Sequence, residues 1–158
     1  MLVELNAQSK CDEPVRRAVW RTLDKEILSS NPLDCRSVLE AKPVKLSASS
    51  ANTFVVRGSG LPYCGATGNC STWIIKRRGR RYEVILNAGS VIKSLEITKR
   101  SSNKYSDLIF RGWMGASEHY VGRYRFDGTK YRLNRCTLEA YSADGIRSTS
   151  KADRTFCQ

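Results

Sequence analysis

The chain has 158 residues, of which 41% are hydrophobic, and this predicts one globular domain rather than a disordered polypeptide. Its 27 Lys and Arg against 15 Asp and Glu give a formal net charge of +12, and such a surface attracts nucleic acid, acidic glycans or an anionic membrane face. No apolar run approaches the roughly 20 residues that a membrane-spanning helix needs, so no transmembrane segment is predicted.

Six cysteines, at positions 11, 35, 64, 70, 136 and 157, are many for a cytosolic protein of this length, and their even number is typical of disulfide pairing. The first eight residues are too few for a signal peptide, and they lack the basic residues with which one begins. We therefore expect a periplasmic or secreted protein whose export signal was removed and is absent from this sequence.

Residues 12–28 have the pattern of a long amphipathic helix. Apolar side chains recur at every fourth position, at Val15, Val19, Leu23 and Ile27. Asp12 can cap this helix, and Pro14 suits its first turn because the missing N–H would be unpaired there in any residue. A shorter helical stretch is expected over 35–41, ended by Pro43.

From Thr53 onward the pattern changes to short strands, which at this spacing are typical of an antiparallel meander. They are expected over Thr53–Arg57, Thr72–Arg78, Arg81–Asn87, Val91–Lys99, Asp107–Arg111, Tyr120–Phe126 and Lys130–Cys136. Residues 137–158 are expected to form a polar tail, loosely ordered from Ser142 to Lys151 and fastened at its end by Cys157. The predicted fold class is α+β in a single domain, with a helical part at 1–46 packed on one curved antiparallel sheet at 53–136 and braced by disulfides.

The first hairpin turns at Gly79-Arg80, where glycine in the first position favours a type II′ turn. Its predicted register pairs Arg78 with Arg81, Lys76 with Glu83, Ile75 with Val84 and Trp73 with Leu86. The face expected to be the core side then holds Trp73, Ile75, Tyr82, Val84 and Leu86. Ile74 and Ile85 meet on the other face, which we expect the N-terminal helix to cover.

The second hairpin turns at Asp127-Gly128, which favours a type I′ turn. Its predicted register pairs Phe126 with Thr129, Arg125 with Lys130, Tyr124 with Tyr131 and Arg123 with Arg132. One face is lined by Phe126, Tyr124, Tyr131 and Leu133. The opposite face carries four cations and no acid.

Cations gather at both hairpins. Five lie within six residues around the first turn: Lys76, Arg77, Arg78, Arg80 and Arg81. The outer face of the second hairpin adds Arg123, Arg125, Lys130 and Arg132. Like charges opposite one another on a sheet are mildly destabilising, and an anionic partner would relieve that repulsion. The alternative is a solvated edge whose charges prevent aggregation, and both interpretations stay open.

The stretch Cys64-Gly-Ala-Thr-Gly-Asn-Cys70 is interpreted as a small disulfide loop, which the glycines and Asn69 can turn. A closed loop of this length contributes about 2–2.5 kcal/mol through chain entropy. Zinc is disfavoured because the spacing is not C-x2-C and the chain has one histidine, and thiol redox chemistry because C-x-x-C is absent. We expect no metal or cofactor. Cys11–Cys35 and Cys136–Cys157 are the other expected disulfides, among several connectivities that six cysteines allow.

His119 is the only histidine, and a catalytic cysteine or serine would need it as a general base. Because no nucleophile motif accompanies it, we interpret it as a loop histidine between strands. Asp107 and Asp127 stand at a strand start and a turn, where aspartate usually bonds to the backbone. No catalytic residue is predicted.

The most distinctive motifs are Cys64-Gly-x-x-Gly-Asn-Cys70, Trp73, Gly79-x-x-Tyr82, Asp107-Leu108 and Tyr124-x-Phe-Asp-Gly128-x-x-Tyr131. Together they resemble a type of small exported bacterial domain to which no activity is assigned. The resemblance covers residues 53–136, and the CGxxGNC loop is its most specific part. It implies an exported β-rich domain and carries over no catalytic or binding residue.

The expected function is that of an exported, non-enzymatic binding domain. Its basic face would meet an anionic surface, a polyanion or an acidic protein partner, with nucleic acid among the candidate polyanions. One alternative is an immunity or inhibitor protein that inserts the basic turn at 76–81 into an acidic cleft. Another is a cell-envelope hydrolase or toxin that uses a cysteine with His119, which disulfide pairing would prevent.

Overall fold

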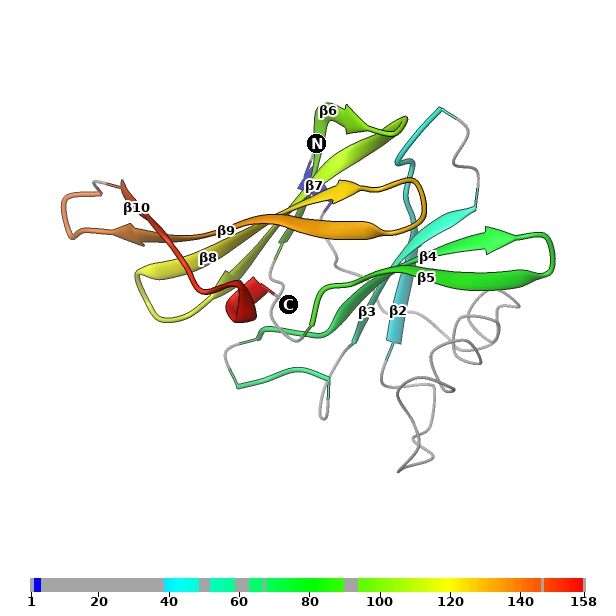
Figure 1. Ribbon diagram of the computed structural model, residues 1–158. Helices are drawn as coiled ribbons and strands as arrows, with labels where there is room; N and C mark the ends of the chain where they lie inside the picture. The colour runs from blue at the N-terminus through cyan, green and yellow to red at the C-terminus, as the bar shows by residue number, and fades with distance from the viewer. Residues whose placement is uncertain are drawn as a thin grey trace.

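The protein folds into two antiparallel β-sheets (Figure 1). The computed structural model describes residues 2–3, 39–48, 52–58, 63–66, 68–89, 94–145 and 147–157. The four-stranded sheet follows chain order through β2 (Leu39–Pro43), β3 (Thr53–Gly58), β4 (Thr72–Arg78) and β5 (Arg81–Asn87). The six-stranded sheet has the order β1 (Leu2–Val3), β6 (Ser94–Ser102), β7 (Tyr105–Trp113), β8 (Glu118–Phe126), β9 (Tyr131–Tyr141) and β10 (Arg147–Lys151). A four-residue 3₁₀ helix, η1 (Arg154–Cys157), follows.

The predicted α+β fold class is wrong, because the structure is nearly all β and has two antiparallel sheets where one was expected. The meander connectivity was predicted, but the chain leaves the four-stranded sheet after β5 and enters the six-stranded sheet at β6. The helix predicted over 12–28 lies outside the described residues. So does most of the shorter one over 35–41, and its last residues belong instead to strand β2.

The polar tail is more ordered than predicted. β9 continues to Tyr141, β10 pairs antiparallel with it, and η1 ends at Cys157. Cys157 is disulfide-bonded to Cys136 and packs with it and with Tyr120 in a small buried cluster. The Tyr124 hydroxyl donates a hydrogen bond to the Cys157 carbonyl, so the end of the chain is held by covalent and polar contacts together.

The register of the first hairpin follows the prediction only near the turn. Ile75 pairs with Val84 as expected, but an irregularity between Ile74 and Ile75 shifts the remaining pairs by one residue, so that Ile74 faces Leu86 and Trp73 faces Asn87. Because one extra residue reverses the inward and outward alternation, the predicted faces are not kept along the whole hairpin.

The second hairpin has a longer turn than predicted. Residues 127–130 form a four-residue loop, and Phe126 pairs with Tyr131 and Arg125 with Arg132. Asp127 Oδ1 accepts hydrogen bonds from the backbone N–H groups of Thr129 and Lys130, both at 2.8 Å, which stabilises the longer loop. A shift of two residues preserves the alternation, so the aromatic face is the predicted one.

The main core lies between the two sheets. Ile74 and Ile85 are fully buried there with Val55, against Leu108 and Phe110 from the six-stranded sheet. The layer that covers Ile74 and Ile85 is therefore the second sheet, in place of the helix expected at this face. An apolar sheet face must be buried against some second layer, and its own sequence does not say whether that layer is a helix or a sheet.

The CGATGNC loop lies between β3 and β4 of the four-stranded sheet and is hydrogen-bonded to the six-stranded sheet. Cys64 and Cys70 are disulfide-bonded, as predicted, with an S–S distance of 2.03 Å. The Asn69 side chain then forms two hydrogen bonds with the backbone of Trp113 at the end of β7: its Nδ2 donates to the carbonyl at 2.9 Å, and its Oδ1 accepts from the N–H at 3.2 Å. This small covalent loop thus presents one amide that pairs with the neighbouring sheet as a strand would.

Candidate anion-binding face

The outer side of the six-stranded sheet carries a group of arginines at one end of β7, β8 and β9. Arg125 lies directly opposite Arg132, and Arg123 directly opposite Arg135. Their neighbours in the strands, Tyr124 among them, point into the core. We define the outer arginine face as Arg100, Arg123, Arg125, Arg132 and Arg135.

Two strand irregularities flank this face. In β6, residues 98–100 lie opposite Asp107 alone, and in β9 Asn134 is an extra residue between Leu133, which faces Tyr124, and Arg135. A bulge leaves a residue unpaired, bends the strand and redirects its side chain. The two bulges stand on either side of the β7–β8 pair at about the same height, and they give the outer face a local concavity.

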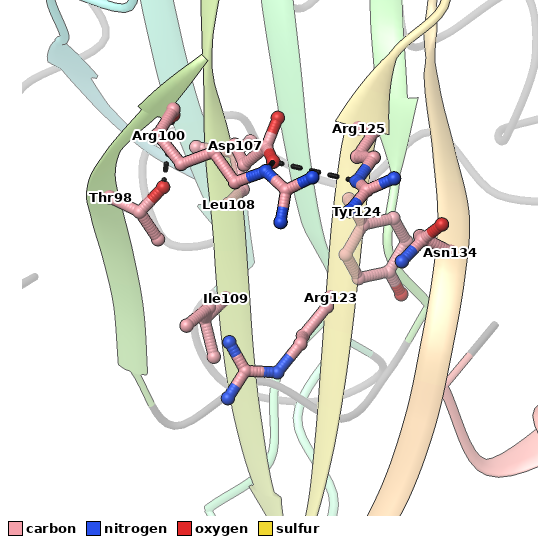
Figure 2. Close-up of a pocket in the computed structure, with 9 residues that line it drawn as sticks. All are labelled: Thr98, Arg100, Asp107, Leu108, Ile109, Arg123, Tyr124, Arg125 and Asn134. Carbon is pink, nitrogen blue, oxygen red and sulfur yellow. Dashed lines mark hydrogen bonds and ion pairs between the residues drawn. The ribbon is translucent and has the colours of Figure 1, made fainter. Parts of the chain in front are cut away.

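That concavity is a hollow of about 140 Å³. Figure 2 shows Arg100 reaching across β7 toward Arg125, with the Arg123 guanidinium beside Ile109. The lining residues are Thr98, Arg100, Asp107, Leu108, Ile109, Arg123, Tyr124, Arg125 and Asn134. The hollow is thus walled by three guanidinium groups from strands β6 and β8 over an apolar residue of β7.

Asp107 is the one acid that lines the hollow, and it comes from β7, beside the hairpin face for which four cations and no acid were predicted. Its Oδ2 lies 3.5 Å from Arg100 Nε and 3.6 Å from Arg125 Nε, and its Oδ1 accepts a 2.6 Å hydrogen bond from the Ser102 hydroxyl. Asp107 is buried, so its position is fixed. One carboxylate oxygen of Asp107 thus forms long ion pairs with both Arg100 and Arg125. Each guanidinium group keeps further N–H donors that could bind an anion.

The other arginines of the face differ in how far they are neutralised. Arg132 Nε lies 2.8 Å from Asp127 Oδ2. The backbone N–H of Lys130, the Arg132 guanidinium and the Thr129 donors all stabilise the ionised Asp127, and they hold the pKa of this carboxyl well below its usual range. Within the part of the chain that the structure describes, Arg123 and Arg135 have no side-chain hydrogen bond or ion pair, although they face each other. The excess positive charge is therefore centred on Arg123 and Arg135.

The hairpin cations lie on the other sheet, and most of them are engaged within the protein. Lys76 donates a hydrogen bond to the Tyr105 hydroxyl, and its Nζ lies 5.0 Å from the centre of that ring. Arg78 forms a 2.8 Å ion pair with Glu83, and Arg77 donates to the Gly79 carbonyl at 2.9 Å.

Three predicted binding cations lie in turns: Arg80 and Arg81 at the β4–β5 turn, and Lys130 between β8 and β9. Arg80 and Arg81 at the first turn are exposed, and their side chains have no partner among the described residues. Lys130, which was predicted on the outer face of the second hairpin, lies in the 127–130 loop instead.

His119 lies within strand β8 and is not the loop residue predicted. It pairs with Trp113 in the ladder, and the two rings are in contact with centroids 3.8 Å apart and planes tilted by 45°, while Tyr141 approaches the imidazole edge-on at 5.5 Å. The four described cysteines are all in disulfides. The predicted Cys11–Cys35 pair lies outside the described residues. No thiol from the described segments therefore stands near His119 as a nucleophile.

Sequence reasoning missed Arg100, Arg135, Asn134 and Asp107 as members of this face. Alternation assigns faces only in a regular strand, and each of these residues lies in or beside an irregularity. The presence of four arginines within residues 123–135 was visible in the sequence, but their partners across the strands depended on the turn length.

Comparisons with known proteins give no relationship: no family model, curated protein or solved structure matches this chain. Across the described ranges, no group of three or more His, Cys, Asp or Glu side chains is placed to hold a metal ion. In the same part of the chain, no helix has the length and apolar character required to cross a membrane.

Proposed function

We propose that this protein is an exported, non-enzymatic binding module that holds an anionic partner on its outer arginine face. The observation that carries the proposal is the placement of Arg123 directly opposite Arg135, with no carboxylate of the described residues bonded to either. Two like charges in register destabilise a sheet, and a bound anion would remove that repulsion. The formal charge of +12 adds long-range attraction for the same kind of partner.

The export component of the proposal rests on the disulfides. Cys64–Cys70 and Cys136–Cys157 need an oxidising compartment to form and persist. Such compartments include the bacterial periplasm and the extracellular space, where anionic glycans and lipid head groups are abundant partners. A periplasmic or secreted location is accordingly part of the proposal.

The test compares two double variants that lower the net charge equally. Arg123→Glu/Arg135→Glu reverses two charges of the outer arginine face, and Arg80→Glu/Arg81→Glu reverses two exposed cations of the β4–β5 turn. With immobilised heparin as the probe polyanion at about 0.1 M salt, we expect the first variant to lose at least about tenfold in affinity and the second less than about twofold. Wild-type affinity should fall linearly with salt on logarithmic axes.

A second candidate keeps the β4–β5 turn as the binding element, because Arg80 and Arg81 are exposed there and have no side-chain partner in the described segments. In that case the protein would be an inhibitor that inserts this turn into an acidic cleft. The same experiment separates the two candidates. Loss of binding only in Arg80→Glu/Arg81→Glu would favour the turn, and equal losses in both variants would mean that net charge alone attracts the polyanion.

A further inference from the structure

The hollow on the outer arginine face has the charge of a site for one doubly charged anion. Three guanidinium groups and one carboxylate line it, which leaves a formal charge of +2. A phosphomonoester carries about −1.5 to −2 at pH 7 and presents three strong acceptor oxygens. One such group would therefore neutralise the hollow.

The size of the hollow restricts how much of a ligand it can take. Its volume is about 140 Å³, whereas pockets that enclose whole small molecules measure roughly 300–1,000 Å³. It is also open on the exposed side of the sheet. These dimensions fit a single charged group with the rest of its ligand outside.

The donors at the hollow suit an oxyanion such as phosphate. Asp107 holds Arg100 and Arg125 on one side of the hollow through its two ion pairs. Arg123 lines the other side, where it is paired with Ile109 of β7 (Figure 2). Guanidinium groups pair with phosphate oxygens in two-pronged contacts that lysine cannot form. The Asn134 side chain, redirected by its bulge, adds an uncharged donor at the edge.

We propose that this hollow binds a single phosphomonoester group, held chiefly by Arg100, Arg123 and Arg125. This inference rests on the proposed function and adds to it the chemical class of the group that the face recognises. The group can belong to a soluble sugar phosphate or to a lipid such as phosphatidic acid, since both present the same dianion. Repeated phosphodiesters, with one charge each, match the +2 hollow less well.

The first test is a titration with inorganic phosphate at pH 7.5 and constant ionic strength, followed by NMR of the arginine Nε–H groups and the Ile109 amide. Saturable shifts at Arg123 and Ile109, larger than those at Arg80 and Arg81, are expected. Non-saturating shifts, or shifts of equal size at all exposed arginines, would overturn the proposal.

Arg123→Lys separates this site from general electrostatic attraction, because it keeps the charge and removes the two-pronged donor. Arg123 has no partner among the described side chains, so the variant should fold normally. We expect its phosphate affinity to fall at least about tenfold, as for loss of a charged hydrogen bond, while heparin binding changes less than about twofold. Unchanged phosphate affinity in this variant contradicts the site even if heparin binding by the face is confirmed.

Two further probes identify the source of the group. Glucose 6-phosphate tests a soluble ligand, and phosphatidylcholine vesicles containing phosphatidic acid test a lipid, each with wild type and Arg123→Lys. Arginine-dependent binding to either one supports the phosphomonoester site and assigns its source. Binding to neither overturns it.

Discussion

At the scale of single residues, Gly122 shows how closely the C-terminal segment packs on β8. A Cβ at this position would lie 2.8 Å from Tyr124 Cε2 and 3.3 Å from Cys157 Cβ. Both neighbours are held, Cys157 by its disulfide and Tyr124 by the hydrogen bond to the Cys157 carbonyl. The absence of a side chain at Gly122 is therefore what lets the ring and the disulfide meet over the strand.

Gly122→Ala is expected to lower the free energy of unfolding by about 1–3 kcal/mol, the usual effect of overpacking a filled site. Gly115→Ala is the matched control, because a Cβ there meets nothing within 4 Å. The control should change stability by less than about 0.5 kcal/mol. Urea unfolding with disulfides intact measures both, and equal stability of the two variants would show that the ring and the disulfide can move aside.

At the scale of elements, the two described disulfides close loops of different length. Cys136 and Cys157 are 21 residues apart, and Cys64 and Cys70 only 6. Because a cross-link restricts the unfolded chain more when the loop is longer, chain entropy gives about 3–3.5 kcal/mol for the first and about 2–2.5 kcal/mol for the second.

Replacing Cys136 and Cys157 together by alanine should therefore destabilise the protein more than replacing Cys64 and Cys70. The measurement is the free energy of unfolding from urea titrations of the two double variants against wild type. The reverse order would mean that the 64–70 loop contributes chiefly through the Asn69 contact to Trp113 and not through its closure.

The elements predicted best were those with both an alternating pattern and a clear turn. β4 and β5 have the predicted bounds, because a glycine turn separates two apolar runs. β10 was missed because all five of its residues are exposed, so it has no alternation to detect. The β6–β7 turn was missed too: Asn103 and Lys104 have positive φ values of 49° and 68°, and lysine gives no sign of such a conformation.

The candidate site was predictable in composition and not in geometry. Arg123, Arg125 and Arg132 were placed on one outer face, and the structure has them there. Arg135 replaces Arg132 as the partner of Arg123, since the hairpin loop is two residues longer and Asn134 bulges. Bulges have no local signature in one sequence, so a hollow formed by two of them could not be inferred.

At the scale of the whole molecule, three buried tyrosines make the stability of the fold depend on pH in the alkaline range. Burial raises the pKa of Tyr124 to about 12, and burial also raises the pKa values of Tyr120 and Tyr131. Tyrosine in the unfolded chain ionises near pH 10. Between these values the unfolded state releases protons that the folded state keeps, so rising pH favours unfolding.

Stability should thus be unaffected by these groups below pH 10 and should fall between pH 10 and 12, by about 1.4 kcal/mol per pH unit for Tyr124 alone. Urea unfolding at intervals across this range measures the slope. Tyr124→Phe should reduce it, because the buried phenol is then absent. A flat profile to pH 12 would mean that these phenols ionise without unfolding.

The fold class depended on a property that local patterns do not contain. One face of the four-stranded sheet is apolar, with Ile74, Ile85 and Val55, and must be covered by a second layer. A helix or a sheet would cover it equally well. The covering sheet is identified only by contacts between residues far apart in the chain, such as the Lys76 hydrogen bond to Tyr105.

The bulge at Asn134 also changes what β9 tolerates in chain length. In a regular strand, deleting one residue moves every later side chain to the opposite face. Asn134 is already the supernumerary residue between Leu133, opposite Tyr124, and Arg135, opposite Arg123. Its deletion would leave each pairing and each face as they are. One position of this strand can therefore be gained or lost while the sheet stays the same, and the feature that comes and goes with it is the hollow.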